Sequence, residues 1–172
     1  AQWETRGSRR HACEARGKLS RVEAEEEDER AEPVDVAAAA RSVADEIRDQ
    51  AEADDIALRT EVGSATMRTR APADQVPIVL RHLLSNAITY TEAGGTVWLR
   101  VGRAGGDVVV EVEDTGIGMD PDEVPALFEP FRQASEGFGR EYEGTGLGLA
   151  VVQRAVDRMG GTVDVATEEG EG

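Results

Sequence analysis

Hydrophobic residues return along three segments of the chain at the intervals expected of helices. Residues 34–55 and 73–91 each carry apolar positions three and four apart, which predicts an amphipathic helix in each. A third helix is predicted within residues 144–161, where glycines stand at both ends of an apolar-rich stretch. The positions expected to be buried are Val36, Ala39, Ala40, Val43, Ala44 and Ile47 in the first helix, and Val76, Val79, Leu80, Leu83, Leu84 and Ala87 in the second.

Shorter segments have the composition and alternation of strands. The Gly105-Gly106 turn joins two of them into a hairpin. The order of elements, without internal repeats, predicts an α+β fold in which helices cover one face of a mixed, mostly antiparallel sheet. The predicted strands are residues 56–62 and 65–70, joined at Gly63-Ser64, then 96–101, 108–114 and 162–167.

One of these strands ends in a carboxylate that faces the core. In the stretch VVVEVEDTGIG, Val108, Val110 and Val112 share the apolar face, and Asp114 falls in phase with them. A buried unpaired polar group costs roughly 2–7 kcal/mol and an ion costs more. Asp114 therefore needs a hydrogen-bond donor, from the protein or from a ligand. Gly116 and Gly118 follow at once and allow a close backbone approach.

Composition narrows the classes of partner. The 172 residues carry 35 acidic and 19 basic side chains, a formal net charge of −16, so neither nucleic acid nor direct membrane contact is expected. Lys18 is the only lysine, which is typical of a host adapted to high salt or of a GC-rich genome. Cys13 is the only cysteine, which excludes an intrachain disulfide and a cysteine zinc cluster.

Three stretches of the chain lack a clear pattern. Residues 1–18 show no period, and residues 20–33 form a charge run that ends in proline, as solvated linkers do. Residues 119–143 form a long stretch with prolines, glycines and no sustained period, which is typical of a lid.

No apolar run approaches the roughly 18 residues of a membrane span, and no signal peptide is evident. A cytoplasmic location is expected, with tethering through upstream segments left open.

Polar side chains line one flank of the second predicted helix. His82, Asn86 and Tyr90 lie four residues apart, beside the buried stripe. A flank of this kind is often only a solvated helix surface. The amide oxygen of Asn86 also suits Mg²⁺, which needs few protein ligands when phosphates supply the rest.

A third motif is GTGLGLAVV. Gly144, Gly146 and Gly148 precede or open a helix whose amide groups can face phosphate. No lysine follows Lys18, so this motif is not a P-loop. Taken alone, this motif and the D-x-G-x-G turn are each compatible with an ordinary glycine-rich turn.

Together, and in this order, the three motifs resemble the ATP-binding catalytic domain of sensor histidine kinases, over about residues 20–170. The wider family, with DNA gyrase, the ninety-kilodalton heat-shock chaperone and mismatch-repair ATPases, shares the Bergerat fold and its ATP lid. LLSNAITYT is similar to the asparagine box, LFEPFRQ to the phenylalanine box of the lid, and LSRVEA with EPVDV to the exit from the dimerisation helices. By this resemblance residues 1–33 are a remnant of the dimerisation helix and linker, and residues 34–172 are the catalytic domain.

The resemblance implies a role for each motif. Asp114 would accept a hydrogen bond from the adenine amine, where guanine has a carbonyl, so ATP would be preferred over GTP. Asn86 would bind Mg²⁺ and act in catalysis, with Arg132 and Arg140 neutralising the transferred phosphoryl group. The implied nucleotide-binding residues are Asn86, Tyr90, Asp114, Gly116, Gly118, Gly144, Thr145, Gly146, Leu147 and Gly148.

The implied reaction is transfer of the ATP γ-phosphate to a histidine on a dimerisation domain, in cis in the full-length protein, and then to a response regulator. His82 stands where gyrase-like ATPases carry a glutamate, which favours transfer over hydrolysis. No phosphoacceptor box is visible in the sequence. His11 is a poor candidate for the acceptor, because the residues around it do not match such a box. The fragment alone is therefore expected to be inactive.

Other departures leave alternatives open. Thr89 stands where many sensor kinases have lysine or arginine, and by the resemblance we expect the family's final strand to be missing after residue 172. A truncated or degenerate module that binds nucleotide without transferring phosphate is the alternative. A serine kinase of the anti-sigma-factor type is a third possibility, against which His82 counts.

Overall fold

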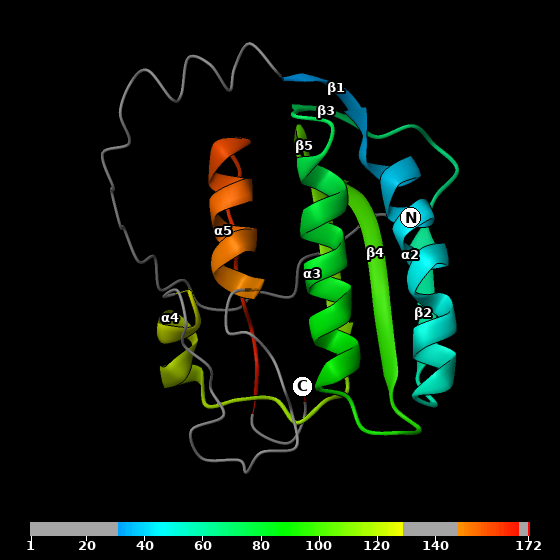
Figure 1. Ribbon diagram of the computed structural model, residues 1–172. Coiled ribbons are helices and arrows are strands. Elements are labelled where there is room, and N and C mark those ends of the chain that lie inside the picture. The colour runs from blue at the N-terminus through cyan, green and yellow to red at the C-terminus, as the bar shows by residue number, and fades with distance from the viewer. Residues whose placement is uncertain (1–30, 129–147, 169–171) are drawn as a thin grey trace.

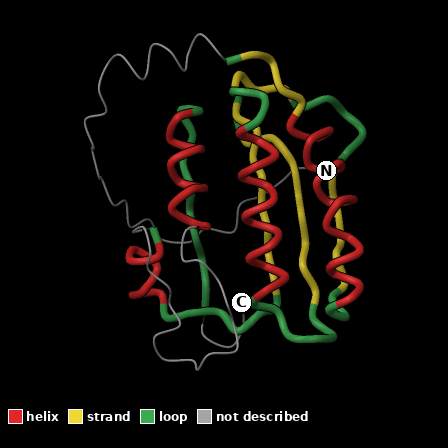
Figure 2. The backbone as a smooth tube through the Cα atoms, in the orientation of Figure 1, coloured by secondary structure: helices red, strands yellow, loops and turns green. Residues whose placement is uncertain are grey.

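The computed structural model describes residues 31–128, 148–168 and 172. The chain forms a layer of helices in front of a layer of strands (Figures 1 and 2). The elements in chain order are β1 (Glu32–Asp35), α2 (Val36–Ala53), β2 (Ala57–Val62), β3 (Arg68–Ala71), α3 (Gln75–Thr89), β4 (Thr96–Ala104), β5 (Asp107–Asp114), the 3-10 turn η1 (Pro121–Glu123), α4 (Val124–Leu127) and α5 (Gly148–Arg158).

The main sheet has the order β2-β4-β5. Strands β2 and β4 run parallel, β4 and β5 form the predicted antiparallel hairpin, and a separate antiparallel pair joins β1 to β3. The hairpin register places Val97 opposite Asp114 and Leu99 opposite Val112. The predicted fold class is thus confirmed: the main sheet is mixed, two of the three strand pairings in the described residues are antiparallel, and the helices lie on one side of the sheet.

The core lies between this sheet and helices α2 and α3. Leu84, Leu99 and Val97 are fully buried at its centre. Val108, Val110 and Val112 pack against it from β5, as the alternation predicts. Ten of the twelve positions predicted in the two helices are buried, and Ala39 and Leu83 are partly buried. The helical period therefore identified the core correctly.

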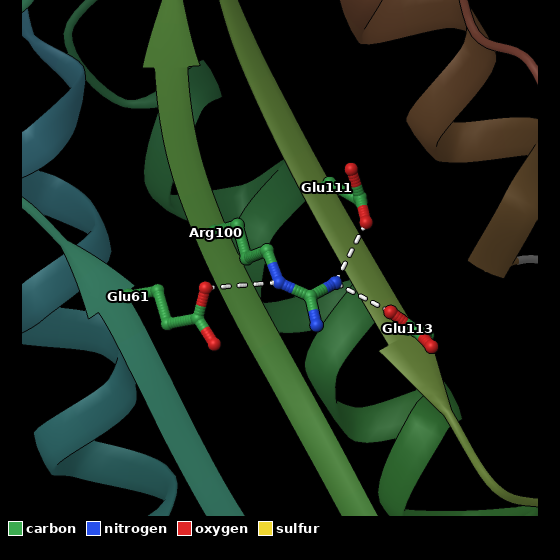
Figure 3. A network of polar contacts seen from close by, with 4 residues as sticks. All are labelled: Glu61, Arg100, Glu111 and Glu113. Carbon is green, nitrogen blue, oxygen red and sulfur yellow. Dashed lines mark hydrogen bonds and ion pairs between the residues drawn. The ribbon is translucent and has the colours of Figure 1, made fainter. Parts of the chain in front are cut away.

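The outer face of the main sheet is polar and is tied by one arginine. Arg100 Nε lies 3.2 Å from Glu61 Oε2 on β2, and its Nη1 lies 2.7 Å from Glu111 Oε1 on β5 (Figure 3). A third ion pair joins Arg100 to Glu113. The guanidinium also stands 5.7 Å from the ring centroid of Trp98. One side chain on the central strand thus contacts charged groups on both neighbours.

Helix α2 begins two residues later than predicted, because Val34 and Asp35 belong to β1. Asp35 caps the helix: its Oδ1 accepts hydrogen bonds from Ala37 N at 3.1 Å and from Met67 N at 3.2 Å. Burial alone would raise the pKa of Asp35, but these backbone donors, with that of Ala38, hold it below its usual value. One carboxylate therefore fixes both the start of α2 and the entry to β3.

The predicted strand at residues 162–167 was wrong, since residues 161–168 have no regular structure. Alternation specifies a face, but a strand also needs a neighbour to pair with. Val163 still packs beside α3 and α5. Strands β2 and β3 lie where two strands joined by Gly63-Ser64 were predicted, but they pair with β4 and β1 and not with each other.

Candidate functional site

Three of the predicted motifs meet at one end of the molecule. The C-terminal ends of α3 and β5 and the N-terminal end of α5 all point to the lower edge of the view in Figure 1. Helices α3 and α5 lie side by side and pack through Val79, Val152 and Ala155. Residues at this end of α3 therefore lie close to the start of α5.

The flank of α3 that carries Asn86 faces α5. At about 100° per residue, Asn86 lies within about 20° of Val79 around the helix axis, and His82 lies about 60° away. Val79 is one of the residues that contact α5. Asn86 and His82 are both partly buried, and Tyr90 caps the end of the helix. The predicted polar row thus borders the space between the two helices.

Asp114 lies at the end of β5, half-buried as its phase predicts. Its Oδ1 accepts a hydrogen bond from Gly116 N at 2.9 Å. Among the residues that the structure describes, no donor pairs with Oδ2. Burial raises the pKa of Asp114, the bond from Gly116 lowers it, and nearby Glu113 raises it, with the pKa above its ordinary value as the net result. A carboxylate desolvated in this way, with one oxygen unpaired, suits a ligand that donates a hydrogen bond.

The turn after Asp114 is held by backbone bonds to two other elements. Thr115 N donates to Thr96 O at 3.1 Å, and Thr96 N donates to Thr115 Oγ1 at 3.0 Å. Ile117 N donates to Tyr90 O at 3.1 Å. The turn is therefore tied both to the start of β4 and to the end of α3, which carries Asn86.

Glycine is required at both positions of the turn, for different reasons. A Cβ at Gly116 would overlap Tyr90 O and stand 2.6 Å from Asp114 Oδ1. Gly118 has a φ of +59°, and a Cβ there would overlap Glu168 O. Gly118 was predicted to let an adenine ring approach, and in the structure its close neighbour is the backbone of Glu168. The close approach at both glycines is to the chain itself.

Of the remaining predicted site residues, the structure describes only one. Gly148 is the first residue of α5. Arg132, Arg140, Gly144, Thr145, Gly146 and Leu147 lie outside the described residues.

Two further observations concern ligands. Within residues 31–128 and 148–168, no group of three or more His, Cys, Asp or Glu side chains could hold a metal ion. A pocket of about 320 Å³ beside the Gly94-Gly95 turn is lined by none of the predicted site residues. Its lining residues are Glu52, Asp55, Ile56, Ala57, Gly94 and Gly95.

Thr91 and Thr115 were not predicted to belong to the site. Thr91 is buried, and its Oγ1 donates to Ala87 O at 2.6 Å at the end of α3. The sequence gives little reason to single them out. Each is a threonine that directly follows a predicted site residue, and threonine is common in turns. Their roles depend on contacts between α3, β4 and β5 that no local pattern encodes.

The chain matches one protein family over residues 72–172, described as histidine kinase-, DNA gyrase B- and HSP90-like ATPase. It is 42% identical over 103 residues to the circadian input-output histidine kinase CikA of Synechococcus elongatus, which is 60% of this chain and 14% of that protein. It is 45% identical over 95 residues to the sensor histidine kinase RcsC of Escherichia coli, 55% of this chain and 10% of that protein.

A longer match reaches an uncharacterised sensor-like histidine kinase of Rhizobium meliloti, 33% identical over 154 residues, 90% of this chain and 29% of that protein. The chain thus spans between 10% and 29% of the length of these three relatives.

Solved structures share the fold. Full-length ShkA in complex with AMPPNP superposes with a TM-score of 0.70 and 34% identity, over 82% of this chain and 29% of that one. The mycobacterial sensor histidine kinase MprB superposes with a TM-score of 0.63 and 26% identity, over 76% of this chain and 80% of that one. In the part of this chain that the structure describes, no helix has the length and apolar character to cross a membrane.

Proposed function

Because the chain belongs to the family of histidine kinase-, DNA gyrase B- and HSP90-like ATPases, we propose that it is the ATP-binding catalytic domain of a two-component sensor histidine kinase. Relatives named as histidine kinases support the choice of branch. The structural observation that carries the proposal is the half-buried carboxylate of Asp114, with Oδ1 occupied by Gly116 N and Oδ2 facing no described donor.

Asp114 recognises the base. Oδ2 accepts a hydrogen bond from the exocyclic amine of adenine. Guanine presents a carbonyl oxygen at that place, so both groups would be acceptors and one would stay unpaired, at a cost of about 1–3 kcal/mol. Since the raised pKa of Asp114 reflects burial, solvent does not easily replace the missing donor. ATP is therefore preferred over GTP.

The phosphates lie between α3 and the start of α5. Backbone N–H groups at the N-terminal end of a helix favour anions, and α5 begins at Gly148 beside the flank of Asn86. Asn86 Oδ1 is suited to hold Mg²⁺ with the phosphate oxygens completing its coordination. The absence of a carboxylate cluster among the described residues fits a metal that is bound mainly by its substrate. Arg132 and Arg140 supply positive charge from the lid.

The reaction is transfer to a protein histidine. A ring nitrogen of the acceptor histidine bonds to the γ-phosphorus, the bond from that phosphorus to the β–γ bridging oxygen breaks, and ADP leaves. His82 occupies the place of the glutamate that activates water in gyrase-like members, and this favours transfer over hydrolysis. The acceptor lies on a dimerisation domain, and a response regulator then receives the phosphoryl group.

One observation favours a second candidate, a module that binds nucleotide without transferring phosphate. Thr89 replaces a basic residue of many sensor kinases, and its Oγ1 donates to Ser85 O at 2.8 Å. This hydroxyl is thus directed at its own helix. This position therefore offers no cation to the phosphates, and one phosphate contact of related kinases is either missing in this chain or made by an arginine.

Calorimetric titration of the purified chain with ATP, ADP and GTP in the presence of Mg²⁺ tests nucleotide binding. We expect both adenine nucleotides to bind and GTP to bind at least about tenfold more weakly, as the unpaired acceptor predicts. Asn86→Ala should lose the Mg²⁺ dependence of ATP binding. Arg81→Ala, an exposed position on the same helix paired with Glu46, serves as the control and should bind ATP normally.

Phosphate transfer is measured separately, with a histidine-bearing dimerisation domain of a related kinase added in trans. Appearance of acid-labile phosphohistidine on that domain supports the kinase. Tight ATP binding without transfer supports the second candidate. A folded sample that binds GTP as tightly as ATP contradicts the assignment of Asp114.

A further inference from the structure

The last turn of α3 is completed by a side chain. The final carbonyl groups of a helix lack backbone donors and need other partners. Here Tyr90 N donates to Asn86 O at 3.0 Å, and Thr91 N donates to Ile88 O at 3.3 Å. The carbonyl of Ala87, between them, receives its hydrogen bond from Thr91 Oγ1 at 2.6 Å. Thr91 is 6% exposed and is the one buried polar residue in the described part of the chain.

The methyl group of Thr91 lies close to Gly95. A Cβ at Gly95 would overlap Thr91 Cγ2 and stand 3.0 Å from Thr115 Oγ1. Gly95 precedes Thr96, whose backbone pairs with Thr115 in the turn after Asp114. Thr91 therefore lies against the crossing point of α3, β4 and the D-x-G-x-G turn.

These contacts connect the two halves of the proposed nucleotide site. Thr91 Oγ1 fixes the turn of α3 that follows Asn86. The next residue back, Tyr90, accepts the hydrogen bond from Ile117 N, and Ile117 is three residues after Asp114. The proposed metal-binding side of the site and its base-binding side are thus joined through the hydrogen bonds of two adjacent residues, Tyr90 and Thr91.

We propose that Thr91 is a positioning residue of the nucleotide site, which sets the carboxylate of Asp114 relative to Asn86 through the end of α3. This inference rests on the proposed function, because it concerns the same site. Thr91 itself touches no nucleotide. Its hydroxyl keeps the Tyr90 carbonyl directed at Ile117, and that bond keeps the turn in place.

The test compares Thr91→Val with Thr91→Ser. Valine has the same shape but no donor, so it leaves the Ala87 carbonyl buried and unpaired, whereas serine keeps the hydroxyl and loses the methyl group. Thr91→Val should bind ATP about tenfold more weakly, the order expected when a buried acceptor loses its donor, with a smaller preference for ATP over GTP. Thr91→Ser should stay close to the wild type in both respects.

Two readouts separate positioning from general stability. Amide hydrogen exchange at Ile117 should accelerate in Thr91→Val and not in Thr91→Ser. The pKa of the Asp114 carboxyl, followed by carbon NMR in the absence of nucleotide, should change only in Thr91→Val. If Thr91→Val does not fold, Thr91→Cys replaces it, since a thiol is a weaker donor at the same place.

Each outcome decides the inference. Lower thermal stability of Thr91→Val with unchanged Ile117 exchange, Asp114 pKa and nucleotide preference would overturn it, because the role would then be structural only. Equal losses in the valine and serine variants would also overturn it, because serine keeps the hydroxyl and the effect would then not follow the hydrogen bond to Ala87. A wild-type chain that binds no nucleotide contradicts the proposed function, and the Ile117 and Asp114 readouts still decide whether Thr91 positions the turn.

Discussion

Asp114, to which we assign recognition of the base, lies in a position that lowers the stability of the fold. Its alternation phase directs it toward the core, and the structure leaves it half-buried with a single described donor. Burial raises its pKa above the ordinary 3.8. A group whose pKa is raised on folding stabilises the protein below its unfolded pKa, and that contribution is lost as the pH rises through the folded pKa. At neutral pH the ionised carboxylate therefore destabilises the empty domain.

The first prediction follows from this destabilising effect of the ionised carboxylate. Asp114→Asn should unfold at the same or a higher temperature than the wild type at pH 7, and should lose ATP binding. The stability difference should shrink as the pH falls through the raised pKa of the folded state, and should be smallest below the ordinary value of 3.8, where the aspartate is neutral in both states. Thermal unfolding across pH, with ATP titration at pH 7, measures both effects.

Asp107→Asn, at the exposed start of the same strand, is the matched control and should keep ATP binding. An Asp114→Asn variant that keeps wild-type affinity for ATP would contradict the role of the carboxylate.

At the scale of single residues, the sequence predicted that Asp114 faces the core and needs a hydrogen-bond donor. It did not predict which group donates. The inward phase of Asp114 was predictable because a strand has a period of two. Its partner Gly116 N was not, because that bond depends on a turn held by Thr96 and Tyr90. Likewise, the sequence shows that Gly118 permits a close approach but not that Glu168 makes it.

Among the elements, helix α3 has two roles, because it both fills the core and borders the proposed site. Leu84 is fully buried against the sheet, whereas Leu83, beside it in the sequence, is only partly buried against the smaller cluster with α5. Leu84→Ala should lower the free energy of unfolding by about 2–5 kcal/mol, as buried leucines do. Leu83→Ala should lose clearly less, and urea unfolding of both variants tests this. Equal losses would mean that the core is not centred where the structure places it.

On the outer face of the sheet, ion pairs and not apolar burial determine the predicted change in stability. Hydrogen bonding to Glu113, and also to Glu111, raises the pKa of Arg100, against the effect of burial. In Arg100→Gln, three carboxylates on adjacent strands lose their shared cation. We expect a loss of about 1 kcal/mol at low salt, since ion pairs near the surface contribute little each but act here as a network.

The loss should decrease in 1 M KCl, where the Debye length is about 3 Å. Unfolding experiments at low salt and in 1 M KCl measure it. An effect independent of salt would point to lost packing against Trp98 instead.

The sequence patterns were wrong for short strands, because a strand forms only where it can pair with a neighbouring strand. Strand β1 has no alternation of its own and exists because it pairs with β3. Residues 162–167 have the alternation but no regular structure. The long helices needed no such information, because their apolar stripes specify one face by themselves.

For the whole molecule, the dominant quantity is charge. The chain carries 35 acidic against 19 basic residues, and like charges oppose compaction over distances that salt controls. Many acidic side chains of the described part lie exposed, with Asp49 and Glu52 on α2 among them. The acidic surface also opposes a polyanionic nucleotide, so cations should assist both folding and binding.

We therefore predict that the unfolding temperature rises with KCl. Screening alone should saturate by a few tenths molar, because the Debye length is already about 8 Å at 0.15 M. A continued rise above 1 M would favour a host adapted to high salt, and saturation would favour a GC-rich genome as the origin of the arginine-rich composition. Asp49→Asn combined with Glu52→Gln removes two of the exposed charges and should lower the salt needed for half of the effect. A KCl series on both proteins at constant pH measures it, and an unfolding temperature that falls as KCl is added would show that self-repulsion does not limit the stability of this domain.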